Sequence, residues 1–278
     1  MQKEPNGTIK LTITIPSSDV KKTWEEVMGE IVKNAEIQGF RKGKAPRKLV
    51  EEKADREKIR EEVLKKLLPL AYANAIKTQN IRPIINPKIH VEKLEDPSAS
   101  SGQVQDWQFT ALTCEAPIIK LGRYKESIQK ITAKTKIIIP GKEYVPAKFE
   151  DIVKALLESV TSEIPSILID NETDRLLSQT LEDVKKLGLT LDQYLSSTGK
   201  NPQTLRDEYR KKAENDIKLE FALLKIAEEE KITVEEKEIQ EATLAAKTDD
   251  ERKNLESNRY LLASVLRQQK TLDFLKNL

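Results

Sequence analysis

The chain has 278 residues, enough for more than one compact domain, and its 48 Lys and Arg nearly balance its 46 Asp and Glu. A formal net charge of +2 excludes a polycation, so any binding to nucleic acid must come from a local basic patch. Hydrophobic residues make up 38% and charged residues 34%, which favours long amphipathic helices with solvated faces over one thick core.

Three observations on the sequence bear on the protein's compartment and on contact with a membrane. The single cysteine excludes an intrachain disulfide, which suits a reducing cytosol. Residues 1–7 contain no apolar run of the kind that a secretory signal needs, and the longest apolar-looking stretch, residues 67–76, is too short to span a bilayer. We therefore expect a cytoplasmic protein without membrane contact.

The first part of the chain alternates between strand and helix patterns. Apolar and polar residues alternate over residues 8–15, which predicts a strand. Apolar residues at helical spacing over 20–31 predict a helix, and a basic segment follows over 39–46. A longer helix is predicted to run to about Thr78, and Pro69 inside it should kink or divide it.

Two further strands are predicted over residues 89–94 and 104–114, with a turn at 96–102 between them. Residues 1–117 therefore predict an α+β domain in which helices cover a small antiparallel sheet. Residues 118–145 are poorly patterned, and we interpret them as an extended linker with some strand character, too short to form another domain.

Residues 146–278 predict a mostly α-helical domain, elongated and with helical arms, because apolar residues recur at helical spacing almost without interruption. Three residue pairs have the composition of helix N-terminal caps: Thr190 with Gln193, Asn201 with Pro202, and Thr233 with Glu236. They predict helices that end near Gly199, Lys231 and Lys247, and a last helix is predicted over residues 257–275.

The sharpest motif is the run Gly39-Phe40-Arg41-Lys42-Gly43-Lys44-Ala45-Pro46, here called the basic loop, which Arg47 and Lys48 follow. Glycines permit positive φ and close backbone approach, and the cations can donate to phosphate oxygens. An exposed phenylalanine can stack on a base or fill a protein pocket. The alternatives are a merely solvated loop, and a Phe40 that anchors the loop in the core.

The residues do not support a catalytic, metal-binding or nucleotide-binding site. His90 and Cys114 are the only histidine and cysteine, which argues against a zinc site, and the sequence shows nothing that would activate them as a catalytic pair. No P-loop, dinucleotide-binding glycine motif or nucleophile elbow occurs. We therefore predict no catalytic residue, no metal and no cofactor.

The basic loop resembles the signature loop of the trigger factor family, the bacterial ribosome-associated chaperones, and the order of strands and helices around it is similar too. The resemblance implies docking on the large ribosomal subunit, through ribosomal protein and rRNA at the tunnel exit, with Phe40, Arg41 and Lys42 at the contact. It also implies that residues 146–278 form the substrate-binding body and arms, although this second likeness rests on helix order.

One departure from the family matters. Trigger factors usually carry an FKBP-type prolyl isomerase domain between these halves, and residues 121–145 are too few to form one. We expect the isomerase activity to be absent.

The leading hypothesis is an ATP-independent chaperone that docks at the exit tunnel and shields nascent or unfolded polypeptides, with a homodimer off the ribosome as an option. Three alternatives remain open at this point. They are an RNA-binding or ribosome-assembly factor without client-holding activity, a prolyl isomerase, and a periplasmic chaperone of similar helical build.

Overall fold

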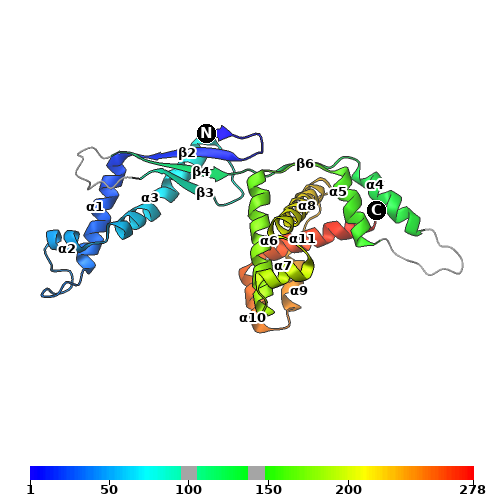
Figure 1. The fold of residues 1–278 in the computed structure, drawn as a ribbon. Coiled ribbons are helices and arrows are strands. Elements are labelled where there is room, and N and C mark those ends of the chain that lie inside the picture. Colours follow the sequence, from blue (N-terminus) through cyan, green and yellow to red (C-terminus); the bar gives the residue numbers. More distant parts are fainter. Residues whose placement is uncertain (95–104, 137–147) are drawn as a thin grey trace. The chain divides into compact units, whose positions relative to one another are not determined.

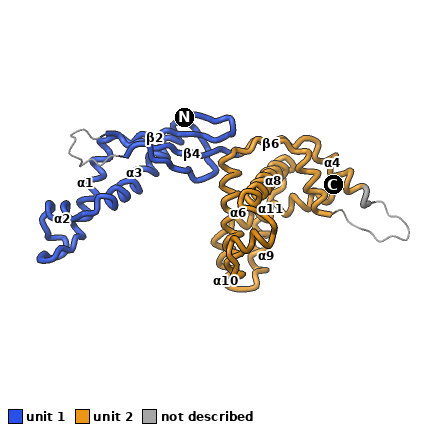
Figure 2. The backbone as a smooth tube through the Cα atoms, in the orientation of Figure 1, with its two compact units in different colours: residues 1–116 blue, residues 117–278 orange. Residues whose placement is uncertain are grey.

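The structure, a computed structural model, describes residues 1–94, 105–136 and 148–278 (Figure 1). These form two compact units, residues 1–116 and 117–278 (Figure 2). The turn predicted over 96–102 and residues 137–145 of the predicted linker lie outside the described residues.

The first unit is built on a four-stranded antiparallel sheet in the order β1-β2-β4-β3. The strands are β1 (Gln2–Lys3), β2 (Ile9–Ile15), β3 (Lys88–Lys93) and β4 (Trp107–Thr113). In β2 the residues Ile9, Leu11, Ile13 and Ile15 are buried, and residues 12 and 14 between them are exposed. This alternation is the one that the sequence predicts, because successive strand residues point to opposite faces.

Two helices cover the buried face of this sheet. Helix α1 (Ser17–Asn34) contributes Val20, Trp24, Val27 and Met28 to the core, and α3 (Arg56–Gln79) contributes Ile59 and Val63. The short helix α2 (Arg47–Lys53) lies between them in the chain and buries only Val50. The α+β architecture predicted for the first part of the chain is confirmed.

Pro69 lies inside α3 but does not divide it, because one helix runs unbroken from Arg56 to Gln79. A proline in a helix interior removes a hydrogen bond and clashes with the preceding turn, at a cost of about 3 kcal/mol. Leu67, Leu68, Ala71 and Tyr72, on both sides of it, pack against the core. Tertiary packing therefore offsets the local penalty.

The second unit begins with a small sheet and a helix where an extended linker was expected. Strand β5 (Ile118–Lys120) pairs antiparallel with β6 (Thr161–Glu163), and α4 spans Tyr124–Lys136. The extended prediction is wrong for α4. Tyr124 and Ile128, four residues apart, are both buried in the core of this unit, a helical spacing too brief to dominate the surrounding polar residues.

The rest of the second unit is helical, as predicted. Its helices are α5 (Phe149–Ser159), α6 (Ser166–Lys186), α7 (Leu191–Thr198), α8 (Pro202–Glu229), α9 (Glu236–Leu244), α10 (Asp249–Ser257) and α11 (Arg259–Lys276). One core joins α4, α5, α8 and α11, and a smaller one joins α6 to α8. Within the described residues, no helix is long and apolar enough to cross a membrane.

The helix caps predicted from the sequence can be compared with the structure residue by residue. Thr190 and Gln193 form the predicted capping box of α7, and the Asn201 side chain caps α8. The box predicted at Thr233 is wrong, because Glu235 and Glu238 form it instead and α9 ends at Leu244. The sequence favours Thr233 over Glu235 because hydroxyl residues are the commoner caps, and α10 is not among the predicted helices.

Replacing Ile128 tests whether α4 belongs to the core of the second unit. Ile128→Ala should lower the free energy of unfolding by about 2–5 kcal/mol, since a fully buried side chain is replaced by a cavity. Urea unfolding of the full chain followed by circular dichroism measures this. Gln129→Ala, at the next and exposed position of the same helix, should change little. Equal effects of the two variants would show that α4 does not pack as described.

Candidate functional site

The basic loop lies in the connection between α1 and α2, which turns back on itself through backbone hydrogen bonds. The Gly43 N–H donates to the Ala35 carbonyl at 2.9 Å and so closes the loop at its base. Inside it, the Phe40 N–H donates to the Ile37 carbonyl and the Lys44 N–H to the Arg41 carbonyl, each at 2.9 Å. The loop therefore has a defined shape.

The two glycines of the loop have different roles. Gly43 has a φ of +70°, and a Cβ atom built there would lie 2.4 Å from the backbone oxygen of Lys33. Gly39 has a φ of +93°, but a Cβ atom there would meet nothing within 4 Å. Gly43 is thus required by both backbone conformation and close approach, whereas Gly39 is required by conformation alone.

The middle of the loop is exposed and its base is anchored. Phe40 is 45% exposed, so its interpretation as a core anchor is wrong, and Arg41 and Lys42 are exposed beside it. Phe40, Arg41 and Lys42 are called the tip from here on. Ala45 is buried and fixes the base, while Pro46 directly precedes α2.

The cations of the loop region are not equally available. Arg47 forms ion pairs with Glu51, at 2.5 Å between Nε and Oε1, and with Glu25 of α1. The hydrogen bonds to Glu51 and then to Glu25 raise the pKa of the Arg47 guanidinium above its ordinary value. Lys42 is also paired, because its Nζ lies 3.1 Å from Oε1 of Glu36.

Three cations of the region remain for a partner. Within the part of the chain that the structure describes, Arg41, Lys44 and Lys48 form no ion pair and are exposed. From the sequence, Arg41, Lys42, Lys44, Arg47 and Lys48 are all candidate phosphate donors, and neither acid that holds Arg47 is predicted. Glu51 follows Arg47 by four residues on one helix, a spacing that reveals the pair, whereas Glu25 is brought close only by the fold.

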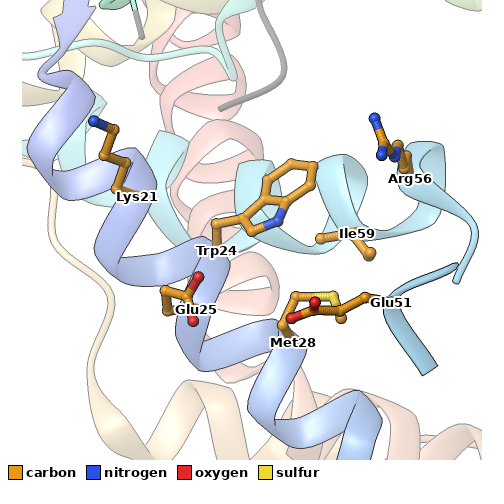
Figure 3. A pocket seen from close by; sticks show the side chains of 7 residues that line it. All are labelled: Lys21, Trp24, Glu25, Met28, Glu51, Arg56 and Ile59. Atoms are coloured by element: carbon orange, nitrogen blue, oxygen red, sulfur yellow. The ribbon is translucent and has the colours of Figure 1, made fainter. Parts of the chain in front are cut away.

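A cavity of about 450 Å³ lies between α1, α2 and α3 (Figure 3). Its lining is formed by Lys21, Trp24, Glu25, Met28, Glu51, Arg56 and Ile59. The figure shows Glu25 on α1 and Glu51 on α2, with the Trp24 ring between α1 and α3. Helix α2 contributes the exposed Glu51 to this lining, whereas its buried residue is Val50.

His90 and Cys114 do not form a catalytic pair. His90 is exposed and pairs in register with Thr110, four residues before Cys114, which is about 13 Å along an extended chain. Cys114 is fully buried, and desolvation raises the pKa of its thiol to about 11. Among the described residues, no group of three or more His, Cys, Asp or Glu side chains is arranged to hold a metal ion.

Among the described residues of the second unit, two hollows are lined mainly by apolar side chains. One, of about 280 Å³, lies between α6, α7 and α8, and Leu177, Leu181, Leu191, Leu195 and Leu205 line it. The other, of about 430 Å³, is lined from α10 and α11 by Leu255, Leu261, Leu262 and Val265. Leu261 is 65% exposed and Val265 50%, so apolar side chains at this second hollow face solvent.

The first unit is thus a sheet with helices that carries an exposed aromatic and basic loop, and the second is a helical unit with open apolar hollows. Two family models match a chain of this build. The model described as bacterial trigger factor protein matches residues 1–152, and the model of the trigger factor C-terminus matches residues 126–277. The chain belongs to the trigger factor family. The two matches overlap, so no stretch between them is left for an isomerase domain.

Individual relatives agree with this membership. Trigger factors of Ligilactobacillus salivarius and Staphylococcus epidermidis are each 34% identical to this chain, over 125 and 124 residues. Each alignment covers 45% of this chain and only 27% of the relative. A solved trigger factor chaperone, studied for promiscuous substrate recognition in folding and assembly activities, has the same fold. Its TM-score is 0.65 at 13% identity, over 99% of this chain and 98% of that one.

Replacing each loop glycine separates close approach from backbone conformation. Gly43→Ala should open the base of the loop, because its Cβ atom cannot coexist with the Lys33 carbonyl. Gly39→Ala meets no neighbour and should cost only the conformational penalty of about 1–2 kcal/mol. Limited trypsin digestion, which cuts after Arg41, Lys42 and Lys44, should be faster for Gly43→Ala than for Gly39→Ala. Equal rates would contradict the role given to Gly43.

Proposed function

We propose that this protein is an ATP-independent chaperone of the cytoplasm that docks at the exit tunnel of the large ribosomal subunit and shields unfolded polypeptides. The observation that carries the proposal is the tip: an aromatic side chain, 45% exposed, beside two cations on a loop of fixed shape. Membership of the trigger factor family supports it.

Docking uses two kinds of contact at once. Arg41, Lys44 and Lys48 are exposed and uncommitted among the described residues, so they can donate to rRNA phosphates, which makes binding sensitive to salt. Phe40 supplies an apolar contact that salt does not screen, to a base or to a pocket in a ribosomal protein. Together they give a docking point of modest charge and some specificity.

Client holding belongs to the second unit. Its two hollows present leucine and valine side chains to solvent, and such patches bind apolar segments of other chains. Each contact is small, so a client is held weakly at several points and leaves when its own core forms. The sequence has no nucleotide-binding motif, and in this proposal release requires neither ATP hydrolysis nor isomerase catalysis.

Docking is tested by removing the tip. The variant Phe40→Ala/Arg41→Ala/Lys42→Ala should lose most cosedimentation with ribosomes, since it removes the aromatic contact and two cations. The log–log slope of its residual affinity against salt should fall by about 0.7–0.9, because Arg41 forms no ion pair with a described residue whereas Lys42 is paired with Glu36. Lys22→Ala/Lys77→Ala removes the same charge from exposed positions of α1 and α3 and should leave cosedimentation unchanged. Unaltered cosedimentation of the tip variant would refute docking by this loop.

Client holding is tested at the α11 hollow. Leu261→Gln/Val265→Gln makes this surface polar with a good helix former and should weaken suppression of aggregation of an unfolded protein by roughly two- to fivefold. Ribosome cosedimentation should be unchanged. Leu70→Gln in α3, also at a leucine that is 65% exposed, is the matched control.

If the wild-type chain fails to suppress aggregation at all, yet binds naked RNA with steep salt dependence, the client-holding part of the proposal is wrong. An RNA-binding or assembly factor would then describe the protein better.

A further inference from the structure

The segment that carries the tip into α2 has little packing to hold it in place. Helix α2 is only seven residues long and buries a single side chain, Val50. An open pocket of about 450 Å³ lies beside it between α1, α2 and α3, and the α2 residue in its lining is the exposed Glu51. The position of α2 relative to α1 must therefore depend on other contacts.

Arg47 supplies such a contact. It is the first residue of α2, directly after the basic loop, and its guanidinium bridges Glu51 on α2 and Glu25 on α1. A planar guanidinium offers several donors in fixed directions, so one side chain can hold two carboxylates in a defined geometry. At the base of the loop, the Gly43 N–H holds the Ala35 carbonyl. The loop is thus fastened at its base and again just beyond it.

We propose that Arg47, Glu25 and Glu51 form a positioning clamp that orders the tip for docking, and that Arg47 is not itself a phosphate contact. The proposal rests on the docking function proposed above. It assigns Arg47 a different role from its basic neighbours Arg41, Lys44 and Lys48, which form no ion pair within the described part of the chain.

The two carboxylates of the clamp place negative charge close to a loop that is proposed to bind a polyanion. By electrostatics alone, removing the two charges should strengthen binding to rRNA, since fewer like charges face the phosphates. If the carboxylates order the tip, removing them should weaken binding instead. The two interpretations predict changes of opposite sign, which makes them separable.

The decisive variant is Glu25→Gln/Glu51→Gln, and its matched control is Glu26→Gln/Glu52→Gln. The control changes the net charge equally, at the next position of each helix, and Glu26 and Glu52 form no hydrogen bond or ion pair with any described residue through their side chains. Titration of labelled full-length chain with large ribosomal subunits should show about three- to tenfold weaker binding for the clamp variant, the range that two exposed ion pairs allow. The control should bind as the wild type does, or more tightly.

Arg47→Lys adds a test that keeps the positive charge. A single ammonium lacks the fork that spans both carboxylates, so binding should fall by an intermediate factor. Thermal unfolding should be nearly unchanged in all these variants, because exposed ion pairs contribute little to global stability. Clamp-variant binding that is equal to or tighter than that of the control would overturn the proposal.

Hydrogen exchange in the free chain separates failure of the clamp from failure of docking. The amides of Phe40, Gly43 and Lys44 donate hydrogen bonds inside the loop, so their exchange reports its order. They should exchange several-fold faster in Glu25→Gln/Glu51→Gln than in Glu26→Gln/Glu52→Gln. Unchanged exchange would overturn the clamp even if the tip docks. Faster exchange, together with a tip variant that still cosediments, would confirm the clamp but refute its use in docking.

Discussion

The pairing of β2 with β4 is the constraint on which the rest of the first unit depends. It aligns residues 9–15 with residues 113–107 in a continuous antiparallel register and so joins two segments that are about a hundred residues apart in the chain. A slip of one residue would turn the isoleucines of β2 from the core to solvent. Because this register fixes the buried face, α1 and α3 have one surface on which to pack, and the connection after α1 becomes a loop with fixed ends.

Much of the fold could be predicted from the sequence because strands and long helices have distinct periods. The alternation in β2 and the caps at Thr190 and Asn201 are local signals, and the structure confirms them. The failures have physical causes. Helix α4 buries one narrow stripe around Ile128 in an otherwise polar segment, and α9 is capped by Glu235, an uncommon cap. The unbroken helix through Pro69 depends on tertiary packing, which no local rule contains.

At the candidate site, too, some features could be predicted from the sequence and others could not. All eight residues of the basic loop were readable as a unit, because glycine, aromatic and basic residues together are unusual between two helices. The sequence could not assign separate roles to its two glycines, since only the fold brings the Lys33 carbonyl against Gly43. It also could not show that Glu25, 22 residues before Arg47, holds that arginine. Composition predicts which charges are present, and the fold decides which remain free.

Which cations of the loop region form ion pairs, and which do not, bears on the proposed function. A chaperone that docks and leaves needs a contact of limited strength, and five free cations around one loop would give a strong, unselective attraction to any RNA. Pairing Arg47 with two acids, and Lys42 with Glu36, lowers that attraction and makes the outcome depend more on Phe40 and on loop shape. In the proposed function, the open apolar hollows of the second unit make weak contacts with clients in the same way. Moderate affinity at each contact would then permit release without an energy source.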